Sequence, residues 1–258
     1  MKRTYSLITA AALGSLLAGS ASAAITSVHT YALGEAGSMS GGKPQDGTGS
    51  SHFGGGSIGT STVTPSPALG STAYATFNGT TQGNWAADLS SFATDNFAVE
   101  MWVRTSNVGQ GTQNFFQLGD SGARLKLGLQ GGNWAVSIHG IAWVGAANGN
   151  GQIASNNTWS HIAVIRDNGT STLYIDGAAQ AGTTAGTPVH SANAHLGVEP
   201  NGGAGNWFDG DLDELNLFTF TSGVDDPVAA LSYFAVPEPS SKALLGLGGL
   251  ALMLRRRR

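Results

Sequence analysis

Three carboxylates alternate along one short stretch near the C-terminal end of the chain. Asp209, Asp211 and Asp213 are each separated by a single residue, the spacing that opens an EF-hand calcium loop. An EF-hand also needs a glycine at its sixth position and a bidentate glutamate at its twelfth. Glu214 and Phe220 stand at those two positions, so the stretch is not an EF-hand, and we expect Asp211 to be solvated.

Asp213 differs from the other two carboxylates because it is expected to be buried. In a β-strand it lies on the same side as Leu215 and Leu217, which we expect to be the core side. A buried, ionised carboxylate is costly unless a cation or several hydrogen-bond donors meet it. Asp213 therefore needs either a cation or a set of backbone amides and Ser or Thr hydroxyls.

The histidines and serines show no pattern of nucleophilic or zinc chemistry. A Gly-x-Ser-x-Gly elbow and the His-Glu-x-x-His spacing are both missing, so a Ser-His-Asp hydrolase and a zinc protease are not indicated. His161 is interpreted as structural, and the other histidines as surface or loop residues: His29, His52, His139, His190 and His195. The chain has no cysteine, which excludes disulfides and thiol chemistry.

Tryptophan side chains are the remaining candidates for a binding site, because sugar sites use exposed aromatic faces beside polar groups. Trp102 shares a predicted strand face with Glu100 and Arg104. The candidates for sugar binding are Trp85, Trp102, Trp143 and Trp207. Packing in the core or in a loop is the alternative for each of them, and Trp134 and Trp159 are assigned to structure.

A β-hairpin between Trp159 and Gly177 is the best-defined element that could position these residues. Residues 161–166 and 171–175 are rich in β-branched and apolar side chains, and Asp167-Asn168-Gly169 between them favours a tight reversal. Such a pair is not stable alone, so its apolar face must be covered by a second sheet.

Further strands are predicted at regular intervals along the chain. Alternating apolar and polar residues place them at 71–77, 97–104, 114–118, 125–129, 134–138 and 212–220, with a first edge strand within 24–34. Residues 37–61 are mostly Gly, Ser and Thr, which predicts a flexible loop, and residues 225–234 are expected to form one short closing helix. With 39 glycines and 11% charged residues, the chain is predicted to be all-β, an antiparallel β-sandwich of the jelly-roll type.

Three motifs along the chain also resemble a known family. The runs Trp159-Ser-His-Ile-Ala-Val, Leu173-Tyr-Ile-Asp-Gly177 and Phe208-Asp-Gly-Asp-Leu-Asp-Glu-Leu215 are similar in order and spacing to the laminin-G-like (LamG) branch of the concanavalin A-like lectin/glucanase superfamily. The resemblance covers residues 71–234, and Phe97 to Val103 fits the early strand of that family. It implies the fold more firmly than an activity.

The resemblance also implies site residues. In related domains an aspartate of the last strand helps to hold a structural calcium ion, which implies Asp213 as a ligand and the carbonyls near Asn78 and Gly79 as partners. The glucanase branch carries its catalytic acids as Glu-x-Asp-x-(x)-Glu on one strand, and this chain has no such run. We therefore expect no enzyme activity.

Both ends of the chain read as sorting signals. Residues 1–23 have Lys2 and Arg3, an apolar run and an Ala-Ser-Ala cleavage site, as in a secretory signal peptide. Residues 236–258 contain Pro237-Glu238-Pro239, a 12-residue apolar run and four arginines, and they resemble the PEP-CTERM sorting tail that a membrane protease of the exosortase type removes. The run is shorter than the ~20 residues that span a bilayer, so it predicts a transient membrane contact, with an uncut anchor as the alternative.

The body between the two signals, residues 24–235, has five basic residues against 15 acidic ones, a net charge of −10. An acidic surface without basic patches argues against nucleic acid as a partner. The sequence thus predicts an exported protein of the cell surface or extracellular matrix that binds glycan or mediates adhesion. A passive component of the exopolysaccharide matrix and a divergent glycan hydrolase are the alternatives.

Overall fold

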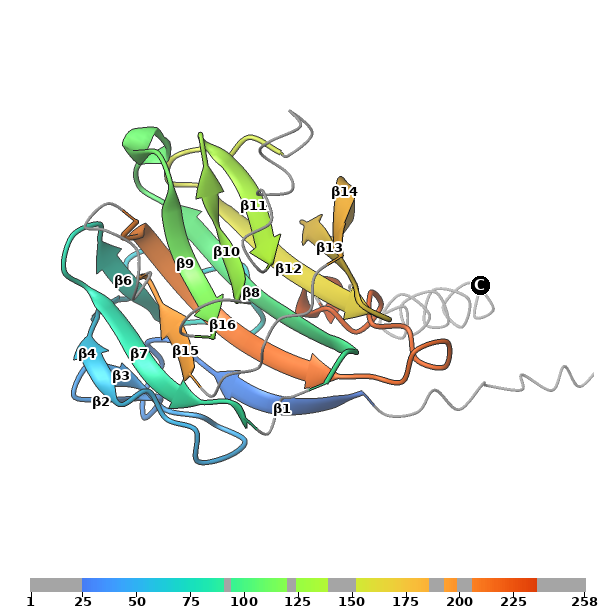
Figure 1. The fold of residues 1–258 in the computed structure, drawn as a ribbon. Coiled ribbons are helices and arrows are strands. Elements are labelled where there is room, and N and C mark those ends of the chain that lie inside the picture. Colours follow the sequence, from blue (N-terminus) through green and yellow to red (C-terminus); the bar gives the residue numbers. More distant parts are fainter. Residues whose placement is uncertain are drawn as a thin grey trace, which may run out of the picture.

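The protein was analysed as a computed structural model that describes residues 25–90, 94–119, 124–138, 152–185, 193–198 and 206–235. Within these residues the strands form two large antiparallel sheets packed face to face, as Figure 1 shows. This arrangement confirms the predicted β-sandwich.

The larger sheet has eight strands. Its order is β14-β13-β12-β8-β16-β6-β5, and β1 pairs with the second half of β16 beside β6. The strands are β1 (Thr26–Tyr31), β5 (Gly59–Ser61), β6 (Tyr74–Asn78), β8 (Phe97–Thr105), β12 (Trp159–Asp167), β13 (Thr170–Ile175), β14 (Ala178–Ala185) and β16 (Asp209–Thr219).

The second sheet has six strands in the order β11-β10-β9-β15-β7-β4. They are β4 (Gly55–Ser57), β7 (Gly83–Asp88), β9 (Gln113–Leu118), β10 (Leu125–Gln130), β11 (Asn133–Ile138) and β15 (Asn193–Leu196). Two short strands, β2 (Met39–Ser40) and β3 (Lys43–Pro44), form a separate ribbon, and η2 (Val108–Gln110) is a single 3-10 turn.

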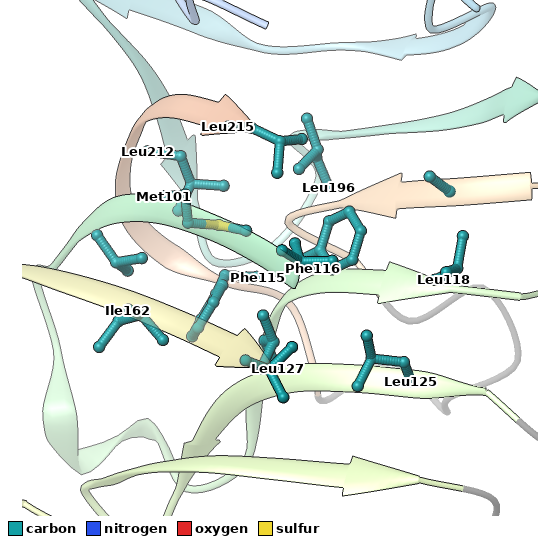
Figure 2. Close-up of a cluster of buried hydrophobic side chains, with 14 of the residues drawn as sticks. Met101, Phe115, Phe116, Leu118, Leu125, Leu127, Ile162, Leu196, Leu212 and Leu215 are labelled. Carbon is teal, nitrogen blue, oxygen red and sulfur yellow. The ribbon is translucent and has the colours of Figure 1, made fainter. Parts of the chain in front are cut away.

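Alternate residues of both sheets form one apolar core between them. Figure 2 shows Met101, Ile162, Leu212 and Leu215 of the larger sheet opposite Phe116, Leu125, Leu127 and Leu196 of the smaller one. All of these side chains are at most 1% exposed. Burial of each such side chain stabilises the fold by ~1.5–3 kcal/mol, and the residues between them along each strand point to the outer faces.

The hairpin of β12 and β13 has the turn that its sequence predicts. Asp167 pairs with Thr170, which leaves Asn168 and Gly169 as a two-residue loop, and both have positive φ values of 46° and 81°. Two consecutive residues of this kind make a type I′ turn, whose twist matches that of the flanking strands.

A β-bulge in β16 reverses the predicted orientation of Asp213. Asp213 pairs with Trp102 while Asn216 pairs with Glu100, so the two residues between them oppose only Met101. Glu214 lies in the bulge with a φ of 49°. Leu212 and Leu215 both reach the core, so Asp213 lies on the outer face with Trp102, and the prediction that it shares the face of Leu215 and Leu217 is wrong.

Two further expectations differ from the structure. Residues 37–61 contain the short strands β2 to β5. Backbone pairing supplies what their composition lacks, because β4 pairs with β7, β5 pairs with β6, and β2 pairs with β3. The buried carboxylate of Asp46 also orders this segment, since it accepts hydrogen bonds from His29, Thr30, Thr48 and Ser51. Residues 225–234 form turns and the 3-10 helix η3 (Ser232–Ala235) rather than one helix.

Two segments cover the outer face of the eight-stranded sheet. Residues 64–73 contribute Ser66 and Ser71, which bond Asp213. Residues 220–235, here called the C-terminal strap, pack Phe220 and Leu231 onto an apolar patch of the same face. Among the described residues there is no helix long and apolar enough to cross a membrane.

Candidate functional site

Asp213 is held by hydrogen bonds on the outer face of the eight-stranded sheet. Its Oδ2 accepts the hydroxyls of Ser66 at 2.7 Å and Ser71 at 2.5 Å, and its Oδ1 accepts the backbone N–H of Glu214 at 2.9 Å. The side chain is fully buried. This is the hydroxyl-and-amide environment that the sequence analysis gave as the alternative to a metal site.

Two more carboxylates converge on Asp213. One oxygen each of Glu35, Asp213 and Glu214 can lie within 4.8 Å of one another. Burial raises the pKa of Asp213 to about 6, and burial together with the charges of Asp213 and Glu35 raises the pKa of Glu214 to about 7. Burial also opposes ionisation of Glu35, but hydrogen bonds from Thr72 and Ala73 outweigh it and lower the pKa of that carboxyl.

The calcium ligands expected from the sequence are not brought together. Asn78 and Gly79 lie at the end of β6, where the Asn78 side chain accepts three backbone N–H groups of residues 80–82. The carbonyl of Gly79 accepts a hydrogen bond from Gln110. Calcium needs six to eight oxygens, and the oxygens nearest Asp213 among the described residues are those of Ser66, Ser71, Glu35 and Glu214. Calcium at Asp213 stays a prediction.

Glu100 and His161 form a buried polar cluster on the same outer face. His161 Nε2 lies 3.0 Å from Glu100 Oε2, and Asn216 Nδ2 donates to Glu100 Oε1 at 2.9 Å. Ser232 of the strap donates to Glu100 Oε2 from both its backbone N–H and its hydroxyl, at 2.8 and 3.1 Å. The Ser232 hydroxyl also lies 3.2 Å from Nε2 of His161. In a catalytic triad the acid and the nucleophile bond opposite ring nitrogens, so this cluster is not one.

Trp102 lies beside this cluster and is 4% exposed. Its ring contacts those of His161 and Tyr233, with centroid separations of 5.3 and 6.1 Å. The prediction of an open aromatic face at Trp102 is therefore wrong for this conformation, because Tyr233 of the strap covers it.

Arg104 is two residues after Trp102 in β8 and lies on the same face of the strand. Its guanidinium lies 4.9 Å from the ring centroid of Tyr74 and 4.8 Å from that of Trp159, and its Nε donates to Asp211 at 2.8 Å. The cation between two aromatic rings stabilises all three side chains. Asp211 is thus paired and buried, and the expectation that it is solvated is wrong.

The outer face of the six-stranded sheet carries a row of polar residues. Ser137, Lys126, Gln117 and His195 pair in sequence across β11, β10, β9 and β15, and the backbone of Trp85 in β7 extends the row. The neighbours of these four residues along each strand point into the core. With strands ~4.8 Å apart, a row of five spans ~19 Å.

This polar row combines hydroxyl, ammonium, amide and imidazole groups. Gln117 is fully buried and His195 is 3% exposed although both are on an outer face. The amide of Asn114, three residues before Gln117 in β9, donates to Gln117 Oε1 at 3.3 Å and to the carbonyl of Val198 at 3.2 Å. Its own Oδ1 has no partner among the described residues. Such a line of fixed donors and acceptors can recognise the hydroxyls of an extended sugar chain.

The sequence pattern alone does not identify the residues of this row. The alternation of 114–118 and 125–129 assigns Gln117 and Lys126 to a polar face, but it gives no information on which strands are neighbours. Trp207 is half-buried, two residues before the start of β16, and its carbonyl accepts a hydrogen bond from Gln110. Trp143, the side chain of Trp85, the signal peptide and Pro237, Glu238 and Pro239 lie outside the described residues.

Comparisons with known proteins agree with this architecture. Residues 69–222 match the family model described as the concanavalin A-like lectin/glucanases superfamily, and residues 235–258 match the PEP-CTERM protein-sorting motif. No curated protein sequence matches the chain.

Solved structures share the fold at low sequence identity. One is domain 4 of AbnA, a GH43 extracellular arabinanase from Geobacillus stearothermophilus in complex with arabinotriose, with 22% identity, a TM-score of 0.52 and coverage of 76% of this chain and 93% of that one. Another is the Trypanosoma rangeli sialidase with the inhibitor DANA, with 15% identity, a TM-score of 0.51 and coverage of 76% of this chain but only 31% of the sialidase. These likenesses show the fold alone. From the family match over residues 69–222 and the two-sheet architecture, the chain belongs to the concanavalin A-like lectin/glucanases superfamily and carries a PEP-CTERM sorting motif.

Proposed function

We propose that this exported protein binds glycan without catalysis, and that the polar row on the six-stranded sheet is its sugar site. The observation that carries the proposal is the row Ser137-Lys126-Gln117-His195, which crosses four strands and places four polar side chains on one outer face. Lys126 is its partly exposed member, and the other three are at most 5% exposed. The paired strands hold such groups in a fixed geometry, and the side-chain amide of Gln117 is fixed further because its Nε2 donates to the carbonyl of Gly119 at 2.6 Å. Fixed groups lower the entropic cost of binding an extended chain.

The charges of the protein support a neutral or cationic glycan rather than an anionic one. The body of the chain carries a net charge of −10, which disfavours approach of polyanions. Domain 4 of AbnA, which shares the fold, was solved with arabinotriose, and this makes neutral oligosaccharides the first ligands to test.

The absence of catalysis is part of the proposal. A glycosidase needs two carboxyl groups ~5–10 Å apart across an open sugar site. Glu35, Asp213 and Glu214 have oxygens within 4.8 Å, but Asp213 is buried beneath Ser66 and Ser71. Glu100 lies beneath Ser232.

The sorting motif supports export and attachment at the cell surface. By the family match, an exosortase-type protease recognises Pro237-Glu238-Pro239, and the apolar run beyond it would hold the chain at the membrane until cleavage. Mass spectrometry of the native protein tests this directly, since a mature C-terminus near these residues is expected.

A glycan array tests the binding function, with the Gln117→Ala protein and the Thr60→Ala protein compared with the parent. Thr60 is exposed on β5 of the other sheet, so Thr60→Ala serves as a control for the loss of a polar side chain outside the row. We expect neutral oligosaccharides to be retained by the parent and the control but not by Gln117→Ala. Retention of no glycan would instead support a passive matrix protein, and turnover of any polysaccharide would support a hydrolase.

A further inference from the structure

The polar cluster beneath the end of the C-terminal strap contains atoms that lack hydrogen-bond partners. Trp102 Nε1, His161 Nδ1 and Asn216 Oδ1 are buried and have none among the described residues. The side chains of Trp102 and His161 are 4% and 0% exposed. Buried polar atoms without partners are rare in folded proteins because each loses its hydration without replacement.

These three residues surround a single carboxylate. Glu100 contacts His161 at 3.0 Å and Asn216 at 2.9 Å, and the rings of His161 and Trp102 are 5.3 Å apart. The cluster thus offers an indole N–H, an imidazole, an amide oxygen and a carboxylate beside an aromatic ring. This combination is suited to a polyhydroxylated ligand, whose hydroxyls both donate and accept hydrogen bonds.

The last turn of the strap, Ser232 to Ala235, covers this cluster at the place where such a ligand would bind. The hydroxyl of Ser232 donates to Glu100 Oε2 at 3.1 Å. The ring of Tyr233 lies over Trp102 and His161, with interplanar angles of 36° and 40°. The backbone N–H and hydroxyl of Ser232 bond Glu100, but Trp102 Nε1, His161 Nδ1 and Asn216 Oδ1 gain no partner from the flap.

This last turn, here called the flap, lies outside the apolar cluster that anchors the rest of the strap. Leu231 directly before it is 1% exposed and packs with Phe218 and Phe220 in an apolar cluster. Phe234 within the flap is 50% exposed. The strap is therefore anchored up to Leu231 by buried apolar side chains, while the flap contacts Glu100, Trp102 and His161 of the polar cluster.

A cavity opens directly beside the flap. It has a volume of about 250 Å³ and is lined by Asn216 and Ser232 together with residues of β1, of β16 and of the 64–73 segment. Asn216 and Ser232 are also members of the polar cluster. A ligand that enters this cavity meets the edge of the cluster before the flap has moved.

We propose that the outer face of the eight-stranded sheet holds a second glycan site, formed by Glu100, Trp102, His161 and Asn216, which the flap covers and competes for. The ligand class is a neutral oligosaccharide, as in the proposed function, but the site is on the opposite sheet and does not depend on the polar row. Ala235, the last residue of the flap, is also the first residue of the sorting-motif match.

The test compares the full-length parent with a Ser232→Ala/Tyr233→Ala variant, which removes the hydroxyl and ring that occupy the site. Arabinotriose and laminaritriose are the probes, and binding is followed by ¹⁵N-tryptophan NMR, with the indole signal of Trp102 assigned by Trp102→Phe. We expect the variant to bind a probe about tenfold more tightly, because apparent affinity scales with the fraction of open protein. We also expect the Trp102 indole signal to shift on binding and Trp102→Phe to remove the gain.

Unchanged affinity in the variant, or a Trp102 signal that no probe moves while the other indole signals remain native-like, would overturn the inference. If the double variant does not fold, Tyr233→Ala alone is read in the same way. Gln117→Ala separates this inference from the proposed function. If Gln117→Ala abolishes binding and the Trp102 indole signal never shifts, the sugar binds to the polar row alone. If the Trp102 indole signal still shifts in the Gln117→Ala protein, the second site is supported.

Discussion

Glu214 offers a quantitative test of the electrostatics around the β16 bulge. Its pKa is raised from 4.5 to about 7, mainly by burial and then by the charges of Asp213 and Glu35. A carboxyl group whose folded pKa is raised holds its proton while the unfolded chain has already lost it. Its stabilising contribution is therefore complete below pH 4.5 and is lost as the pH rises towards 7 and beyond.

The magnitude follows from the size of the shift. At about 1.4 kcal/mol per pKa unit, a shift of this size costs on the order of 3 kcal/mol at alkaline pH. Glu214 is partly exposed and shares its repulsion with Asp213, so solvent screening and double counting reduce this value. We expect Glu214→Gln to stabilise the protein by about 1.5 kcal/mol at pH 8 and by close to zero at pH 4.5.

The assay is urea unfolding in EDTA at several pH values between 4.5 and 8.5, for the parent and the Glu214→Gln protein. Asp46 does not interfere in this range, because its carboxyl has a pKa of about 2. The parent should lose stability steadily as the pH rises, and the variant should show a shallower slope. Parallel pH profiles for the two proteins would refute the reasoning.

Three further predictions concern the core, the hairpin turn and the carboxylates. Leu127→Ala removes a fully buried side chain and should lower the free energy of unfolding by ~3 kcal/mol in urea titrations; a loss below ~1 kcal/mol would contradict its central position. Gly169→Ala places a side chain at a φ of 81° and should cost ~1 kcal/mol, and an unchanged midpoint would argue against the type I′ turn. Calcium should raise the melting temperature at pH 8 more than at pH 5.5, since protons compete for Asp213 and Glu214; no rise, or an equal rise in Asp213→Asn, would exclude calcium at this cluster.

Local sequence was sufficient to predict the hairpin and the two-layer architecture. Asn168-Gly169 marks a two-residue turn by its tolerance of positive φ, and the structure confirms this register. The alternation of Leu125, Leu127 and Leu129 likewise predicts which residues face the core. Both signals act over a few residues, and this is the range in which sequence patterns are informative.

The orientation of Asp213 could not be predicted from a local pattern of alternating residues. It depends on one extra residue in β16, which forms a bulge at Glu214. A positive φ is uncommon for residues other than glycine and asparagine, so a glutamate at this position does not predict a bulge. A single inserted residue moves every following side chain to the other face. The side chain of Asp213 therefore lies on the outer face of the sheet and not on the core face that the alternation predicts.

The burial of Trp102 depends on contacts that are distant in sequence. Tyr233, 131 positions later in the chain, covers its ring, and the alternation within β8 contains no information about that contact. The strands at Gly55–Ser57 and Gly59–Ser61 also depend on residues distant in sequence, because they pair with the backbones of β7 and β6.

Isothermal titration calorimetry of the full-length protein with the glycan that it retains on an array is the most direct test of the proposed sugar site. Titrations of Gln117→Ala and Lys126→Met should show affinity losses of about tenfold or more, since each removes hydrogen bonds to the ligand worth ~1.5 kcal/mol. The Thr60→Ala control should bind like the parent. Undiminished affinity in both row variants would contradict the account, because the polar row on the six-stranded sheet would then play no part in recognition.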